Sequence, residues 1–147
     1  MSTVADRVRG RVDLSVSTAG LLLGDLVAIA AFVIIGEMSH SIDPLANPGI
    51  VADTYVPFLV GWLLAAGLAG VYARGLHESP RRKAVTVLGA WLVADAVGQL
   101  LRSTAYFHGD AALTFALVAA AVGGLFLVAW RLVLVAVMPR FRSTGRA

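Results

Sequence analysis

Four long stretches of apolar residues, separated by short polar segments, dominate the pattern of this chain. They cover residues 18–36, 56–72, 84–101 and 111–138, with boundaries that are approximate. A helix needs about 20 mainly apolar residues to cross the hydrocarbon core of a bilayer, and each stretch reaches or approaches this length. The stretches are rich in Ala and Leu and lack the two-residue alternation that marks membrane strands. The pattern therefore predicts four transmembrane helices.

Polar residues at the ends of these stretches predict where the helices begin. Ser79 followed by Pro80 is typical of an N-cap and a first helical residue, so it predicts the start of the third helix. Asp53 or Thr54 is the predicted cap of the second helix. Asp110 is the predicted cap of the fourth helix.

The composition agrees with a membrane protein. Apolar residues make up 59% of the 147 residues and charged residues only 14%, whereas a soluble domain has roughly a half and a quarter. The mean hydropathy is +0.82. This balance excludes both a soluble globule and a disordered chain, and the absence of cysteine excludes disulfides and thiolate catalysis. We therefore predict an all-α integral membrane bundle of four transmembrane helices that forms a single domain over residues 1–147.

The basic residues predict the orientation of the bundle. Of the twelve Lys and Arg residues, ten lie in the N-terminal segment, between the second and third stretches, or in the C-terminal tail: Arg7, Arg9, Arg11, Arg74, Arg81, Arg82, Lys83, Arg140, Arg142 and Arg146. The positive-inside rule then predicts that both termini are cytoplasmic, in a multi-pass protein of the cell membrane. Each basic segment borders a span, so anionic lipid headgroups are the predicted partners and nucleic acid is excluded.

Small residues four positions apart occur in every predicted span. The pairs are Gly20 and Gly24, Ala66 and Gly70, Ala94 and Gly98, and Ala120 and Gly124. Helices in lipid associate where small side chains let their backbones approach closely. These pairs therefore favour a compact bundle, and they also offer surfaces for a homo-oligomer.

Asp25 is a charged residue near the middle of the first span. A charge at the centre of the bilayer costs roughly 2.5–3.5 kcal/mol, so its presence needs an explanation. One interpretation is a structural carboxyl group that is protonated or hydrogen-bonded between helices. The other is a proton or cation site.

A polar seam follows one face of the third span. Asp95, Gln99 and Arg102 lie on one side of a helix at these spacings. The seam is interpreted either as a hydrogen-bonded ladder that fixes helix register or as one wall of a water or solute path. Arg102 is predicted to fold back towards Asp95 through Gln99, or else to pair with Glu37.

Arg131, in the fourth span, has two interpretations. It either lies at the cytoplasmic interface beside Trp130 or forms an ion pair with Asp25. At the outer end of the first span, Glu37 and His40 are three residues apart and are candidate lining residues. No recognised metal-ligand spacing includes them, so we predict no metal and no other cofactor.

Several short motifs together resemble the DUF3054 family of uncharacterised membrane proteins. These are Gly24-Asp25, Gly36-Glu37 with His40, Pro57-Phe58 with Gly61-Trp62, Pro80-Arg81, Gly98-Gln99 with Arg102, and Trp130-Arg131. Their order and spacing cover the chain from about Gly20 to Val137. The resemblance implies a small multi-span protein and no particular substrate.

Two classes of function are consistent with these residues. We expect a non-catalytic structural or accessory component of the membrane, because one four-helix bundle leaves little room for alternating access. The alternative is a small transporter or proton or ion pathway that uses intramembrane carboxylates. Its centre would be Asp25, and its outer approach would be lined by Glu37, Asp95, Gln99 and Arg102. No zinc-protease, serine-hydrolase, P-loop or dinucleotide motif is present, so the prediction is that the protein is not an enzyme.

Overall fold

The computed structural model describes residues 16–73, 79–107 and 109–143, with side-chain surroundings up to residue 137. This part of the chain is helical and contains no strand. Four helices in it are long and apolar enough to cross a membrane: Ser17–Ser39, Pro48–Ala69, Pro80–Arg102 and Leu113–Val137. The prediction of an all-α protein with four candidate membrane spans is confirmed. Basic residues that lie outside the described side chains are Arg7, Arg9, Arg11, Arg74, Arg140, Arg142 and Arg146, and the orientation in the membrane stays a prediction.

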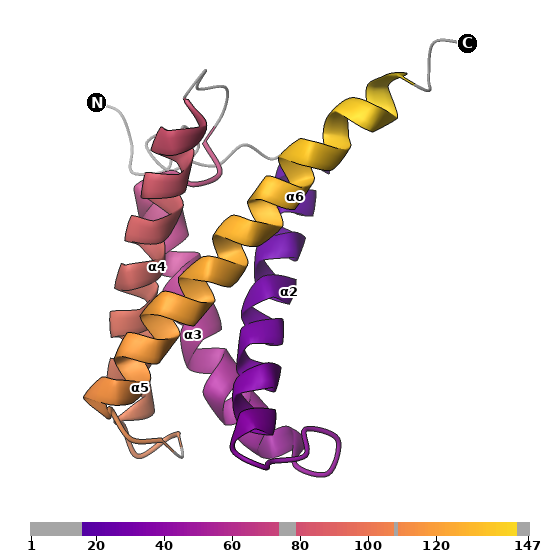
Figure 1. Cartoon of the computed structure of the whole chain (residues 1–147). Helices are drawn as coiled ribbons and strands as arrows, with labels where there is room; N and C mark the ends of the chain where they lie inside the picture. Colours follow the sequence, from indigo (N-terminus) through magenta and orange to yellow (C-terminus); the bar gives the residue numbers. More distant parts are fainter. Residues whose placement is uncertain (1–15, 74–78, 108, 144–147) are drawn as a thin grey trace, which may run out of the picture.

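The four spans alternate in direction (Figure 1). In chain order the elements are α2 (Val16–Ser39), α3 (Pro48–Ala69), α4 (Pro80–Arg102), α5 (Leu113–Val118), the π-helical turn η1 (Ala119–Gly123) and α6 (Gly124–Ser143). Helix α2 begins, α4 begins and α6 ends at the same end of the bundle, at the top of Figure 1. We call this the Lys83 end and the opposite end the Glu37 end.

Helix α3 begins eight residues earlier than the apolar pattern indicated, at Pro48. Proline suits the first turn of a helix because its fixed φ is helical and its missing N–H has no partner to lose there. The prediction that Asp53 or Thr54 caps this helix is wrong, since both residues lie within it. The helix ends before residue 72, because Gly70 takes a left-handed conformation with φ 69° and closes the last turn.

The starts of the third and fourth spans give one confirmed and one wrong prediction. The Ser79 hydroxyl accepts a hydrogen bond from the Arg82 backbone N–H at 3.3 Å, so Ser79 is the N-cap of α4. Asp110 does not cap the fourth span, because α5 begins at Leu113 with Ala112 before it. The helix α6 continues to Ser143, past the predicted end of the apolar stretch at residue 138.

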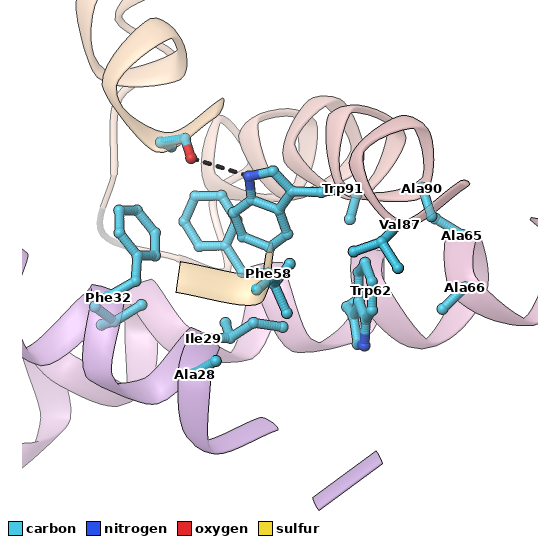
Figure 2. Close-up of a cluster of buried hydrophobic side chains, with 14 of the residues drawn as sticks. Ala28, Ile29, Phe32, Phe58, Trp62, Ala65, Ala66, Val87, Ala90 and Trp91 are labelled. Carbon is cyan, nitrogen blue, oxygen red and sulfur yellow. Dashed lines mark hydrogen bonds between the residues drawn. The ribbon is translucent and has the colours of Figure 1, made fainter. Parts of the chain in front are cut away.

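Aromatic side chains form the centre of the bundle (Figure 2). Phe58, Trp62 and Trp91 are fully buried. The rings of Phe32 and Phe58 meet edge to face at 5.7 Å between centroids, and those of Phe58 and Trp91 stack at 5.8 Å. Such pairs add about 0.5–1.5 kcal/mol to the burial of their area. The core therefore joins α2, α3 and α4 at one place.

Small residues bring some of the helices close together, but not at every predicted pair. A Cβ at Gly61 would overlap the Ala94 carbonyl, and a Cβ at Gly98 would lie 2.9 Å from the Phe58 ring. Backbone contact between α3 and α4 therefore depends on Gly61 and Gly98. Gly20 has no neighbour within 4 Å among the described atoms, so this glycine does not bring α2 close to another helix.

The fourth span contains a π-helical turn that the sequence did not reveal. At this turn the Trp91 indole N–H donates to the Ala119 carbonyl at 3.0 Å, the bond drawn as a dashed line in Figure 2. A π turn inserts one residue and frees carbonyl groups from the helical hydrogen-bond pattern. A Cβ at Gly123 would overlap the Trp91 ring, so the glycine leaves room for the indole to reach the turn.

Candidate functional site

The first polar cluster surrounds Asp25, which has no exposed surface. The Arg131 guanidinium donates from Nε to Asp25 Oδ1 at 3.2 Å and from Nη2 to Oδ2 at 2.6 Å. The Tyr72 hydroxyl donates to Oδ2 at 2.6 Å, and the Trp62 indole N–H donates to the Tyr72 oxygen at 2.9 Å. We call these four residues the Asp25 cluster. Both carboxylate oxygens therefore have donors.

Each member of the Asp25 cluster comes from a different place in the fold. Helix α2 supplies Asp25, α3 supplies Trp62, α6 supplies Arg131, and Tyr72 lies in the short segment after α3. The left-handed Gly70 ends α3, and the Val71 N–H then bonds to the Ala66 carbonyl at 3.0 Å, which folds the chain back. This turn is what brings the Tyr72 hydroxyl to the carboxylate.

Close packing positions the ion pair of the cluster. A Cβ at Gly24 would overlap the Trp130 indole, so only glycine leaves room for that ring beside Asp25. The next residue of α6, Arg131, then meets the carboxylate. Of the two interpretations of Arg131 that the sequence left open, the structure shows the ion pair with Asp25.

Tyr72 acts in the cluster as a hydrogen-bond donor. Burial raises the pKa of its hydroxyl, and the neighbouring Asp25 carboxylate raises this pKa further. The phenol therefore keeps its proton and donates a hydrogen bond to Asp25, while its oxygen accepts one from the Trp62 indole N–H. A buried ion pair needs additional hydrogen bonds of this kind, since desolvation otherwise offsets the attraction between the charges.

The second polar group is the seam on α4. Gln99 Nε2 donates to Asp95 Oδ1 at 2.9 Å, and both side chains are buried. Gln99 Oε1 has no hydrogen-bond partner in the described part of the chain. The structure thus brings Asp95 and Gln99 together as a short ladder that is incompletely satisfied.

Arg102 departs from both predicted arrangements. Its guanidinium carbon lies 4.1 Å from the centroid of the Phe115 ring, and Nε and Nη1 are buried without a hydrogen-bond partner. Among the described residues it forms no ion pair with Asp95 or Glu37. A cation over the face of an aromatic ring gains about 0.5–2 kcal/mol, which stabilises this position.

A cavity of about 280 Å³ opens at the Glu37 end between α2, α3 and α5. Glu37 and His40 line it, and Glu37 Oε1 accepts a hydrogen bond from Thr54 Oγ1 at 2.6 Å. His40 is exposed. Within the described residues no group of three His, Asp or Glu side chains is arranged to hold a metal ion.

Sequence reasoning missed two members of the Asp25 cluster, Tyr72 and Trp62. The signal for Tyr72 was present: it follows a glycine at the end of a span, in the same half of the bundle as Asp25. The signal for Trp62 was weaker, because a tryptophan in an apolar span is usually a packing residue.

The four long apolar helices among the described residues define the protein as a small membrane protein. The sequence model of the DUF3054 family, described as a protein of unknown function, matches residues 22–134. This match covers most of the chain, so the protein belongs to that family, as the motifs had indicated. No curated protein and no solved structure matches the chain.

Proposed function

We propose that this protein is a non-catalytic structural or accessory component of the cell membrane, with both termini in the cytoplasm. The observation that carries the proposal is the environment of Asp25. Its carboxylate has no exposed surface, and both of its oxygens accept hydrogen bonds from Arg131 or Tyr72. A buried carboxylate whose two oxygens both accept hydrogen bonds from other parts of the fold is typical of a structural contact between helices.

A carboxylate that carries protons or ions must exchange them with water. Asp25 lines neither the cavity at the Glu37 end nor the two cavities of about 200 and 420 Å³ at the Lys83 end. Removing one partner of a buried ion pair costs about 3–5 kcal/mol, so the Arg131 contact opposes release of the carboxylate. The cluster acts instead as a clamp that holds α2, α6 and the segment after α3 together.

The surface of the bundle supports the proposed partners. Large apolar side chains are exposed on every span, for example Leu23, Leu64, Leu92 and Leu132. These surfaces suit lipid chains, and the partners that we propose are membrane lipids with anionic headgroups at the cytoplasmic face. A second copy of the chain is a further proposed partner, because Gly20 and Gly89 have open space beside them for another helix. We do not propose nucleic acid as a partner.

The alternative function is a small transporter or a proton or ion pathway. The observation in its favour is the α4 seam, where Gln99 Oε1 has no partner among the described residues. Asp95 and Gln99 lie on the same helix as Arg102, towards the Glu37 end. A path through this seam would use Asp95 rather than Asp25.

Proton flux into reconstituted vesicles separates the two functions. The native protein, Asp25→Asn and Asp95→Asn are compared under an imposed membrane potential, with Asp110→Asn as the control because Asp110 is an exposed carboxylate outside the spans. We expect no protein-dependent flux in any of the four. Flux in the native protein that Asp95→Asn or Asp25→Asn abolishes, and Asp110→Asn does not, would overturn the structural role.

A further inference from the structure

Two neighbouring cavities lie at the Lys83 end of the bundle. One has a volume of about 200 Å³ and lies between α2, the segment after α3, and α4. The other has a volume of about 420 Å³ and lies between α2, α4 and α6. Leu21, Lys83, Val87 and Arg131 line both of them. The two cavities therefore share a boundary that contains two cations.

The charge at this boundary is positive. Lys83 and Arg131 are the charged side chains among the described residues that line the two cavities, and no carboxylate lines either one. Asp25 balances Arg131 from the core side, so Lys83 contributes one net positive charge. The ion pair uses Nε and Nη2 of Arg131, and its side chain keeps 19% exposure. Nη1 of Arg131 makes no hydrogen bond to the described residues, so it is available as a donor to a ligand.

The two cavities differ in chemistry on either side of these cations. The smaller one has polar side chains in its lining, Thr18, Tyr72 and Thr86. The larger one is lined mainly by aliphatic side chains, among them Val128, Leu132 and Val135 of α6. Leu132 and Val135 are more than half exposed on the outer surface of the bundle, where lipid chains lie in a membrane. A polar cavity beside an apolar cavity suits a ligand that has a polar headgroup and an apolar chain.

We propose that these cavities bind one anionic phospholipid of the surrounding leaflet. Its phosphate lies between Lys83 and Arg131, its headgroup enters the smaller cavity, and an acyl chain lies along α6 in the larger cavity. Basic pockets between transmembrane helices are a recurring way of binding anionic headgroups.

This site deepens the proposed function and rests on it, because anionic lipids are already among the proposed partners, but a structural protein and a transporter can both hold such a lipid. Its test is therefore separate from the flux experiment. The full-length protein in detergent is titrated with dioleoylphosphatidylglycerol or with dioleoylphosphatidylcholine, and bound lipid is counted by native mass spectrometry. We expect one phosphatidylglycerol to bind more tightly than phosphatidylcholine.

Two variants test the position of the site. Lys83→Gln is expected to weaken phosphatidylglycerol binding about five-fold, the usual contribution of one basic residue near anionic lipid. Arg81→Gln is the matched control: it removes the same charge from the same turn of α4 but lines neither cavity, and we expect unchanged binding. Ala84→Phe is expected to weaken binding by filling the larger cavity, while thermal unfolding confirms that each variant is folded.

Three results would overturn the proposal. Equal binding of the two lipids would show that charge does not select the ligand. Equal weakening by Lys83→Gln and Arg81→Gln would show attraction to the surface charge as a whole. Displacement of the lipid by millimolar inorganic phosphate would show a site for a soluble anion instead of a lipid.

Discussion

The two ends of the bundle differ in whether their buried polar side chains have hydrogen-bond partners. At the Lys83 end, Asp25 and Arg131 form an ion pair that Tyr72 completes. At the Glu37 end, Arg102 lies over the Phe115 ring, and its Nε and Nη1 atoms have no hydrogen-bond partner among the described residues. The side-chain oxygen of Gln99 has no hydrogen-bond partner among them either. The comparison teaches that a charged residue in a span can be a fully hydrogen-bonded contact between helices or a side chain that is buried without an ion-pair partner. The first end is organised to hold helices together, and the second carries polar groups that its packing does not require.

The largest expected effect is on the ion pair. Asp25→Ala leaves Arg131 without its partner and is expected to lower the free energy of unfolding by about 3–5 kcal/mol. Denaturant unfolding in detergent micelles measures the change. The double variant Asp25→Leu with Arg131→Met removes both charges, so it is expected to recover most of the loss. A double variant no more stable than Asp25→Ala would show that the pair itself, and not the unpaired charge, sets the stability.

The next effect is on the hydrogen bond that completes the pair. Tyr72→Phe removes the phenol donor but keeps the ring, and a bond to a charged group contributes about 1.5–3 kcal/mol. The same unfolding experiment measures it. Tyr55→Phe is the matched control, because the Tyr55 hydroxyl bonds to the neutral Leu26 carbonyl at 3.2 Å and is expected to contribute less. An equal loss in both variants would contradict the closed arrangement of the Asp25 cluster.

A smaller effect is expected in the α4 ladder. Gln99→Leu removes one hydrogen bond to Asp95 together with the unpartnered carbonyl oxygen. Loss of the bond leaves the buried Asp95 without this partner, which costs about 1–3 kcal/mol, and removal of the unpartnered oxygen offsets part of that cost, so the expected loss of unfolding free energy is about 1 kcal/mol. Asp95→Leu in the Gln99→Leu background measures the coupling between the residues. A coupling as large as that of the Asp25 cluster would remove the contrast between the two ends.

The smallest effect is expected at Arg102. Arg102→Met keeps the length of the side chain and removes a cation whose Nε and Nη1 are unpartnered in the described structure. The lost contact with Phe115 is worth about 0.5–2 kcal/mol and is offset by relief of desolvation, so stability is expected to stay within about 1 kcal/mol of the native value. A loss comparable to that of Asp25→Ala would reveal a partner for Arg102.

The sequence predicted the four candidate spans and the Ser79 cap, because apolar length and capping residues are local signals. It did not predict that α3 begins at Pro48. The segment from residue 48 to residue 55 is mixed in polarity, which is typical of a loop. In the structure it is helical, and the Thr54 hydroxyl donates a hydrogen bond to the Glu37 carboxylate. A tertiary contact of this kind leaves no periodic signal.

The candidate site was predicted only in part for a similar reason. Asp25 and Arg131 were each visible as charges in apolar stretches, but more than one hundred residues separate them. Their pairing depends on Gly24, which admits the Trp130 ring, and on the rotation of α6 around its axis. Neither is encoded in the spacing of the two charged residues themselves.

That rotation is set by the π-helical turn η1. A π-helical turn takes one more residue than an α-helical turn, so each residue after it faces about 100° away from its direction in a regular helix of the same sequence. The turn lies between the part of the fourth span that packs at the Glu37 end and the part that carries Arg131, so a single inserted residue decides which way the arginine faces. If the fourth span were a regular α-helix with the same residues, the Arg131 guanidinium would face about 100° away from its present direction and would not reach the Asp25 carboxylate. The π-helical turn therefore lies outside the Asp25 cluster and yet determines whether that cluster can close.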